Sequence, residues 1–319
     1  MFPEPSIERI QVEQEYKYHS GEIKGATIMK IEVPIVSAFV DGDSGGNPAG
    51  VVLHAERFSS EQKQKIAAAV GLSETAFVSP SDSADIKLEF FTPTQQIAHC
   101  GHATIATFSY LRQNGLLAHD QSSKETIDGC RSIKMEGDSA YMEQKAPRYE
   151  PLNSADLQLT LQALGITSAD LIAGAKPTLV NTGNSFVVIG IRDVDTIKGL
   201  QPDLALIEQL SDALDLIGFY VFSFDGVGDG RDAGARMFGP RYGIQEESAT
   251  GMAAGPLACY LREFLGIDKH EFTVEQGRWM SPPSASVINV RLHIDSDGKI
   301  ERLFAGGRGA LKEVTEVTV

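Results

Sequence analysis

The chain has few basic residues and few cysteines. Its 319 residues include 28 lysines and arginines against 43 aspartates and glutamates, a formal net charge of −15. Nucleic acids and anionic membranes bind clustered lysine and arginine, so this charge argues against both as partners. Three widely spaced cysteines make no disulfide framework and favour free thiols in a reducing, cytoplasmic compartment. No apolar run approaches the length of a membrane span.

What is present is the composition of a folded protein with about two domains. Hydrophobic residues make up 42% of the chain and charged residues 22%, which is ordinary for a globular protein. The first 28 residues mix charges throughout and lack the apolar core of a signal peptide. We expect an N-terminal extension over 1–28, a first domain over 29–150, a linker near Pro147–Pro151, and a second domain over 151–319 whose terminal strands can cross back.

The stretch LEFFTPTQQIAHCGHATIATFSYL, from Leu88 to Leu111, has the strongest chemical signal. An apolar strand ends at Pro93, because proline cannot donate to a strand ladder. A helix of small and apolar residues is expected to begin at Gly101, with unpaired amide groups and its positive dipole end open to an anion such as a carboxylate. Because Cys100 and His102 stand at the same point, we place the chemistry there.

A second stretch repeats this order of events. Phe238-Gly239-Pro240 leads to Ile244 and Glu247, and a helix of small side chains follows from about Met252. Aligned without gaps, Cys100 falls on Glu247. Helices that lead into strands recur upstream in both halves; the first begins at Ser59 in a capping-box pattern. We therefore predict a duplicated α/β fold.

Glu74 is the acidic residue that distinguishes the first half from the second. It stands at the entry to a predicted strand, where the second half has Ile217-Gly218. A carboxylate in one copy of a duplicated scaffold indicates a functional asymmetry. The alternative, commoner for any single glutamate, is a solvated loop acid.

Several motifs occur in a consistent order along the chain. They are GNPAGVV at 46–52, SETAFV at 73–78, FFTP at 90–93, CGHAT at 100–104, ATG at 249–251 and EQG at 275–277. Together, from about Met29 to the C-terminus, they resemble the PhzF (phenazine biosynthesis-like) family. The resemblance implies a diaminopimelate-epimerase-like fold of two similar domains, each wrapping a sheet around a central helix, with the active site between them. It also implies cofactor-independent isomerisation of a small carboxylate, often by a homodimer.

The resemblance also assigns roles to residues. In the characterised phenazine enzyme, the glutamate of the SET motif moves a proton on a dihydro-hydroxyanthranilate, and that position here is Glu74. The implied catalytic residues are Glu74, His102 and Glu247, and the implied substrate-binding residues are Asn47, Gly101, Thr250, Gly251 and Met252. Where the family reads E-D-P-A-T-G-S, this chain has Glu247, Ser248 and Met252 in place of the aspartate, proline and serine. These departures argue against the phenazine substrate itself and favour a related acid.

Other interpretations remain open. Cys100 and Glu247 could be the opposed bases of a racemase or epimerase, although Cys100 is more simply a small buried residue. His99 and His102 beside Cys100 could suggest zinc, but a closed site needs four ligands and no second cluster follows, so we expect neither metal nor cofactor. A non-catalytic ligand-binding or interaction protein could retain the same fold. Cys130 and Cys259 are expected to pack in cores.

Overall fold

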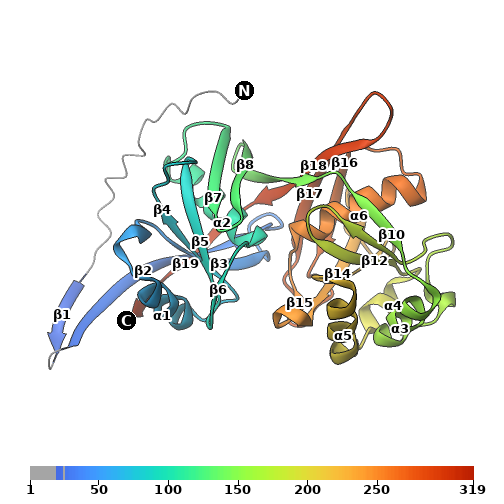
Figure 1. The fold of residues 1–319 in the computed structure, drawn as a ribbon, viewed down its shortest axis with the longest axis horizontal. Coiled ribbons are helices and arrows are strands. Elements are labelled where there is room, and N and C mark those ends of the chain that lie inside the picture. Colours follow the sequence, from blue (N-terminus) through green and yellow to red (C-terminus); the bar gives the residue numbers. More distant parts are fainter. Residues whose placement is uncertain (1–18, 24–25) are drawn as a thin grey trace. The chain divides into compact units, whose positions relative to one another are not determined.

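The computed structural model describes residues 19–23 and 26–319, and the chain divides into two compact units (Figure 1). Unit 1 contains the described residues up to Phe39 together with Pro48–Met142 and Gly307–Val319. Unit 2 contains Val40–Asn47 and Glu143–Gly306. The end of the chain therefore belongs to the first unit. The expected N-terminal extension over 1–28 lies mostly outside the described residues.

Unit 1 is built mainly of strands. They are β1 (His19–Ile23), β2 (Ala26–Ala38), β3 (Asn47–Val52), β4 (Thr75–Ser79), β5 (Ile86–Phe91), β6 (Gln96–Ile97), β7 (Gln121–Thr126), β8 (Gly129–Glu136), β9 (Ser139–Lys145) and β19 (Ala310–Thr318). The first residue of β3, Asn47, and the end of β9 from Glu143 on belong to unit 2. Its helices are α1 (Ser60–Val70), α2 (Gly101–Gln113) and the short 3₁₀ helix η1 (Ala55–Arg57). The last strand, β19, pairs antiparallel with β2, and Val317 packs into the same core as Ile31 and Val33.

Unit 2 contains more helix. Its strands are β10 (Arg148–Pro151), β11 (Thr178–Asn181), β12 (Ser185–Gly190), β13 (Gly218–Ser223), β14 (Ala233–Gly239), β15 (Ile244–Glu247), β16 (Glu271–Gln276), β17 (Ser286–Ile294) and β18 (Ile300–Arg308). Its helices are α3 (Ser154–Leu164), α4 (Val194–Gly199), α5 (Leu204–Leu214) and α6 (Gly251–Leu265), with 3₁₀ helices η2 (Ser168–Asp170) and η3 (Pro240–Tyr242). The expected linker at Pro147–Pro151 is wrong, because β10 occupies it and pairs with β11.

The two units repeat one order of strand pairings. In unit 1, β3 is parallel to β4, β4 and β6 are each antiparallel to β5, and α2 leads to β7, which is parallel to β5. In unit 2, β12, β13, β14, β15, α6 and β16 follow in the same order with the same senses of pairing. The predicted duplicated α/β fold is confirmed.

A helix rich in small side chains lies in the interior of each unit. Every residue of α2 from Gly101 to Leu111 is buried, and so is α6 from Gly251 to Leu261 apart from Met252. Small residues let the surrounding strands approach a helix closely, and close packing then leaves no room for larger ones. At Gly255, for example, an added side-chain carbon would lie 2.8 Å from Cδ of Gln144.

Local sequence signals set the helix ends. Ser59 accepts a hydrogen bond from the Gln62 amide, and the Gln62 side chain accepts one from the Ser59 amide, which is the predicted capping box of α1. The helix ends at Gly71, whose φ of 71° is a left-handed conformation that favours glycine. In the part of the chain that the structure describes, no helix is both long and apolar enough to cross a membrane.

One detail of the repeat differs from the gapless alignment. Cys100 is the N-cap of α2 and Thr250 is the N-cap of α6, so Cys100 corresponds to Thr250 and not to Glu247. Glu247 lies in β15, which pairs with β14 through a register shift between Met237 and Gly239. An insertion of this kind moves every later residue along the chain, and an ungapped comparison cannot detect it.

The cysteines differ from one another in burial. Cys100 and Cys259 are buried, as expected, whereas Cys130 is exposed. The expectation that Cys130 packs in a core is wrong, because it lies on β8 with its sulfur 3.4 Å from the Ser83 hydroxyl at the protein surface.

Candidate active site

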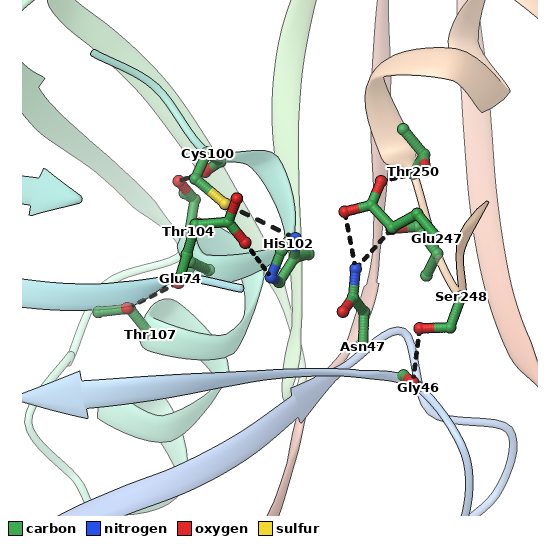
Figure 2. Close-up of polar contacts among 12 residues, drawn as sticks. Gly46, Asn47, Glu74, Cys100, His102, Thr104, Thr107, Glu247, Ser248 and Thr250 are labelled. Atoms are coloured by element: carbon green, nitrogen blue, oxygen red, sulfur yellow. Dashed lines mark hydrogen bonds and ion pairs between the residues drawn. The ribbon is translucent and has the colours of Figure 1, made fainter. Parts of the chain in front are cut away.

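Glu74, Cys100 and His102 lie together in unit 1 (Figure 2). Glu74 immediately precedes β4, and the other two stand at the start of α2. All three are buried, with exposed fractions of 7%, 5% and 4% respectively. Nε2 of His102 is 3.3 Å from Oε2 of Glu74, and Nδ1 of His102 is 3.6 Å from Sγ of Cys100. The imidazole therefore lies between a carboxylate and a thiol.

The protonation states in this cluster follow from burial and from the two ring nitrogens. Burial raises the pKa of the Cys100 thiol, against the opposing effect of His102, so the sulfur keeps its proton at neutral pH. A neutral imidazole has one donor and one acceptor nitrogen. With a thiol at Nδ1 and a carboxylate at Nε2, the ring accepts at Nδ1 and holds its proton at Nε2. This arrangement can pass a proton between the ring and Glu74.

The same three residues could in principle hold a metal ion, because their donor atoms lie within 4.8 Å of one another. A closed structural zinc site needs four ligands. Here the three residues offer three donor atoms, one short of that number, and each nitrogen of His102 already faces one of the other two side chains. The geometry fits proton transfer better than metal binding.

A second polar cluster lies in unit 2, around Glu247 (Figure 2). Nδ2 of Asn47 donates to Oε1 of Glu247 at 3.0 Å and to the Ala249 carbonyl at 3.1 Å. The Thr250 hydroxyl donates to the other carboxylate oxygen, Oε2. Both oxygens thus accept hydrogen bonds, which fixes the orientation of the side chain. Asn47, Glu247 and Thr250, predicted separately from sequence, are in contact.

The side chain of Gln276 links the residues of this second cluster through hydrogen bonds. Its Nε2 donates to the Glu247 carbonyl at 2.7 Å and to the Thr250 hydroxyl at 3.1 Å. Its Oε1 accepts from the Thr250 amide at 3.0 Å and from the Tyr220 hydroxyl at 2.9 Å. Gln276 is 1% exposed, so all of its hydrogen-bonding capacity is used inside the protein. It therefore fixes the start of α6.

The remaining predicted positions lie at the first turns of the two central helices. Gly101 and Gly251 are the first residues of α2 and α6, and the Gly251 carbonyl accepts from Nε2 of Gln144 at 2.9 Å. Met252 is partly exposed, and Nδ2 of Asn184 lies 3.2 Å from its sulfur. Ser248, at the position of the family's proline, donates from its hydroxyl to the Gly46 carbonyl at 3.0 Å.

Two buried polar residues near these clusters were not identified as site residues from sequence. Gln276 stands in the EQG motif, which could have identified it. Lys124 on β7 gave no such signal, because it lies in the polar run QSSKET. It is nevertheless 0% exposed and contacts the start of α2.

Comparisons with known proteins agree with this architecture. A family model described as phenazine biosynthesis-like protein matches residues 36–313. The uncharacterized isomerase YfhB of Bacillus subtilis (strain 168) is 30% identical over 285 residues, which cover 88% of this chain and 90% of the relative. A trans-2,3-dihydro-3-hydroxyanthranilate isomerase of Pseudomonas chlororaphis is 29% identical over 290 residues, 87% of this chain and 98% of that protein.

A solved structure agrees as well. The crystal structure of the Bacillus anthracis phenazine biosynthesis protein of the PhzF family is similar with a TM-score of 0.82 and 26% identity, covering 90% of this chain and 99% of the other. The family match spans most of the chain, and its relatives are isomerases. The chain therefore belongs to the phenazine biosynthesis-like (PhzF) family and is an isomerase of that type.

Proposed function

We propose that this protein is a cofactor-independent isomerase that moves a proton on a small carboxylate, with Glu74 as the general acid/base. The observation that carries the proposal is the position of the Glu74 carboxylate. It is buried, and Oε2 lies 3.3 Å from an imidazole nitrogen that can share its proton. General acid/base groups on carbon acids need a positioned side chain whose proton can be taken up and returned.

Glu74 is a better proton carrier than the neighbouring thiol. Burial raises the pKa of Cys100, so little thiolate is available at neutral pH. In our proposal the thiol donates to Nδ1 of His102 and fixes the orientation of the ring, while Nε2 faces Glu74. Cys100 then supports the acid/base pair without itself removing the substrate proton.

Glu247 has a different role in the proposal. Because its two oxygens accept from Asn47 and Thr250, it is an oriented carboxyl group that binds a polar or cationic part of the substrate. The substrate class is a small cyclic or amino-acid-like carboxylate. The Pseudomonas chlororaphis relative is named for a dihydro-hydroxyanthranilate, but Met252 replaces a family hydroxyl, and we propose a related acid.

A racemase or epimerase that uses Cys100 is the second candidate. The contact of 3.6 Å between Cys100 Sγ and Nδ1 of His102 favours it, since an imidazole can activate a thiol. A mechanism with Cys100 and Glu247 as opposed bases is less favoured, because the second-half residue equivalent to Cys100 is Thr250. A threonine hydroxyl cannot act as a base at neutral pH.

The test is incorporation of solvent deuterium into carbon, followed by NMR over a panel of small carboxylates. Glu74→Gln keeps the size of the side chain and removes its titrating proton, so exchange should fall by about a hundred- to ten-thousand-fold. Cys100→Ser should keep most of the exchange. Cys130→Ser, at an exposed thiol, is the matched control for the cysteine change.

Each other outcome has a definite meaning. Exchange that survives Glu74→Gln and is lost in Cys100→Ser would contradict the assignment and favour the epimerase. Absence of exchange in the unaltered protein, with acids that demonstrably bind to it, would favour a ligand-binding protein on the same fold.

A further inference from the structure

Lys124 is a fully buried lysine beside the acid/base cluster of unit 1. It lies on β7, where Ser122, Lys124 and Thr126 face inward, and it is 0% exposed. Burying an ammonium group is unfavourable unless it is paired or strongly hydrogen-bonded. Among the described residues, no carboxylate forms an ion pair with Lys124. Its burial therefore has no explanation in a salt bridge.

The contacts of Lys124 lead to the start of α2. Its amino group donates to the Thr104 hydroxyl at 2.6 Å, lies 3.4 Å from Nδ1 of His99, and sits 5.2 Å from the centre of the Phe90 ring. The Thr104 hydroxyl in turn donates to the carbonyl of Cys100, also at 2.6 Å. Two consecutive hydrogen bonds thus connect the lysine to Cys100, the N-cap residue of α2. Figure 2 shows the contact of the Cys100 side chain with His102.

We propose that Lys124 is a positioning residue for the Glu74–Cys100–His102 cluster, acting through the Thr104 hydroxyl on the first turn of α2 and placing its amino group beside that turn. For its activity readout, the proposal rests on the isomerase function proposed above. Lys124 does not touch the reacting atoms. It holds the backbone that carries the thiol and the imidazole, and its charge stabilises negative charge nearby.

The dependence on pH follows from the surroundings of Lys124. Burial lowers the pKa of Lys124 to about 7; Cys100 and Asp128 raise it, and Arg131 lowers it. These groups face it from α2, from the turn after β7 and from β8. The remaining neighbour, His99, is neutral here, because burial and the charge of Lys124 hold its pKa well below the usual value. Lys124 is therefore the group in this set that changes charge near neutral pH.

The sign of the effect is fixed by the charge. Below about pH 7 the ammonium form of Lys124 is present and stabilises an anionic substrate; above about pH 7 the amino group is neutral and this stabilisation is lost. At an effective dielectric constant near 20, a unit charge about 12 Å away changes such an equilibrium by about 1.4 kcal/mol, which is about tenfold. The kcat/KM of the unaltered protein should therefore fall by about tenfold as the pH rises through neutrality.

Three variants separate this role from ordinary packing. Lys124→Met keeps the length of the side chain and removes the charge, so the fall in kcat/KM through neutral pH should disappear. Thr104→Val breaks the connection but keeps the charge, so that fall should remain at a lower overall rate. Thr107→Val is the matched control, because its buried hydroxyl donates to the Ala103 carbonyl at 2.7 Å in the same way, one turn further along α2, without contacting the lysine.

A second readout does not depend on isomerase activity. In a Cys130→Ser background, alkylation of Cys100 by iodoacetamide is followed by mass spectrometry from pH 6 to 9. At pH 6, where Lys124 carries its charge, the loss of this cation in Lys124→Met should slow alkylation of Cys100 about threefold or more, since the thiolate is the reactive form. Above about pH 8 the two rates should converge. Thr107→Val should react at the rate of the Cys130→Ser background.

The outcomes distinguish this proposal from the proposed function. If the unaltered protein shows no deuterium exchange but Lys124→Met still slows alkylation, the isomerase proposal fails and the positioning role stands. Alkylation of Lys124→Met at an unchanged or increased rate at pH 6 would overturn the positioning role, as would an overall rate of exchange in Thr104→Val equal to that in Thr107→Val.

Discussion

At the scale of single residues, the site depends on which atoms face one another more than on which residue types are present. Glu247 illustrates this, because each of its oxygens accepts from a different donor, Asn47 on one side and Thr250 on the other. Glu247→Gln would replace one acceptor with an amide that donates. Because the Thr250 hydroxyl already accepts from Gln276, one donor would be left without an acceptor.

We expect Glu247→Gln to lower the free energy of unfolding by about 1–3 kcal/mol, the usual effect of an unsatisfied buried polar group. Urea unfolding followed by circular dichroism measures this. Glu208→Gln, at an exposed position of α5, is the control and should change stability by no more than about 0.5 kcal/mol. Equal stability of the two variants would show that the hydrogen bonds of Glu247 do not stabilise the fold.

Lys124 gives a second prediction at this scale, on the dependence of stability on pH. The pKa of its amino group is about 7 in the folded protein and 10.5 in an unperturbed lysine. Between these values the unfolded state binds more protons, so stability rises with pH, by up to about 1.4 kcal/mol per pH unit. Urea midpoints at pH 7 and pH 8.5 should show this rise in the unaltered protein.

The rise should be lost in Lys124→Met and retained in Lys87→Met, which alters a partly exposed lysine on the neighbouring strand β5. It should also stop near pH 9, because burial raises the pKa of Cys100 and the unfolded chain then ionises this thiol first. A flat profile in the unaltered protein would contradict the burial argument for Lys124.

At the residue scale, the family's motifs identified residues that are distant in the sequence and close together in the structure. Glu74, His102, Asn47 and Thr250 came from the family's motifs, and the structure brings them into two clusters. Lys124 could not be found in this way, because a lysine between serine and glutamate in a strand of alternating burial looks solvated. Only tertiary packing buries this lysine, because its amino group contacts Thr104 of α2 and the Phe90 ring.

At the scale of elements, backbone conformation explains why Gln276 can reach the start of α6. It is followed by Gly277, whose φ is 76° and where an added side-chain carbon would lie 2.6 Å from the Ser248 carbonyl oxygen and closer still to that of Ser284. Both the left-handed backbone and the lack of space require glycine. This is the physical reason for the glycine of the EQG motif.

Gly277→Ala and Gly298→Ala make a matched pair that tests this reason. Gly298 has φ of 81° but nothing within 4 Å of an added carbon. Alanine there should cost about 1–2 kcal/mol for the left-handed conformation alone. Gly277→Ala should cost at least about 3 kcal/mol, because the clash adds to the strain. Equal thermal midpoints for the two variants would show that the loop around Gly277 relaxes freely.

Elements were predicted best where their ends are signalled locally. The capping box at Ser59 and the glycine at Gly71 fixed α1, since both depend only on neighbouring residues. The stretch at Pro147–Pro151 was wrongly predicted to be a linker, because it contains two prolines. In the structure Pro151 is the last residue of β10, which pairs with β11. The register shift between β14 and β15 also has no local signal in the sequence.

At the scale of the whole molecule, the duplicated order of elements explains why the motifs recur. The structure also shows that unit 1 is completed by a strand from the end of the chain. Unit 1 is completed by β19, whose residues pair with β2 from Ala310 opposite Ser37 to Thr318 opposite Lys30. The buried Val317 packs with Ile31 in the core. Periodicity alone could not reveal this pairing, because the two strands lie at opposite ends of the chain.

The last prediction compares the effects on stability of deleting either end of the chain. A deletion of residues 1–28 leaves Met29, whose backbone N–H and C=O both pair with Val319, so the sheet of β2 and β19 stays intact. What the described residues lose is β1 and the first residues of β2. We expect the thermal midpoint to fall by no more than about 2–4 °C, equivalent to roughly 1 kcal/mol in a protein of this size.

Deletion of residues 310–319 is the contrasting change. It removes all of β19, leaves the paired edge of β2 open and exposes the core around Ile31, so unit 1 should lose its cooperative unfolding transition. Calorimetry of the two truncated proteins measures both effects. A large fall after removal of residues 1–28 would instead show that the N-terminal extension packs against the folded protein, and its removal should then also expose a surface that hydrogen exchange would detect.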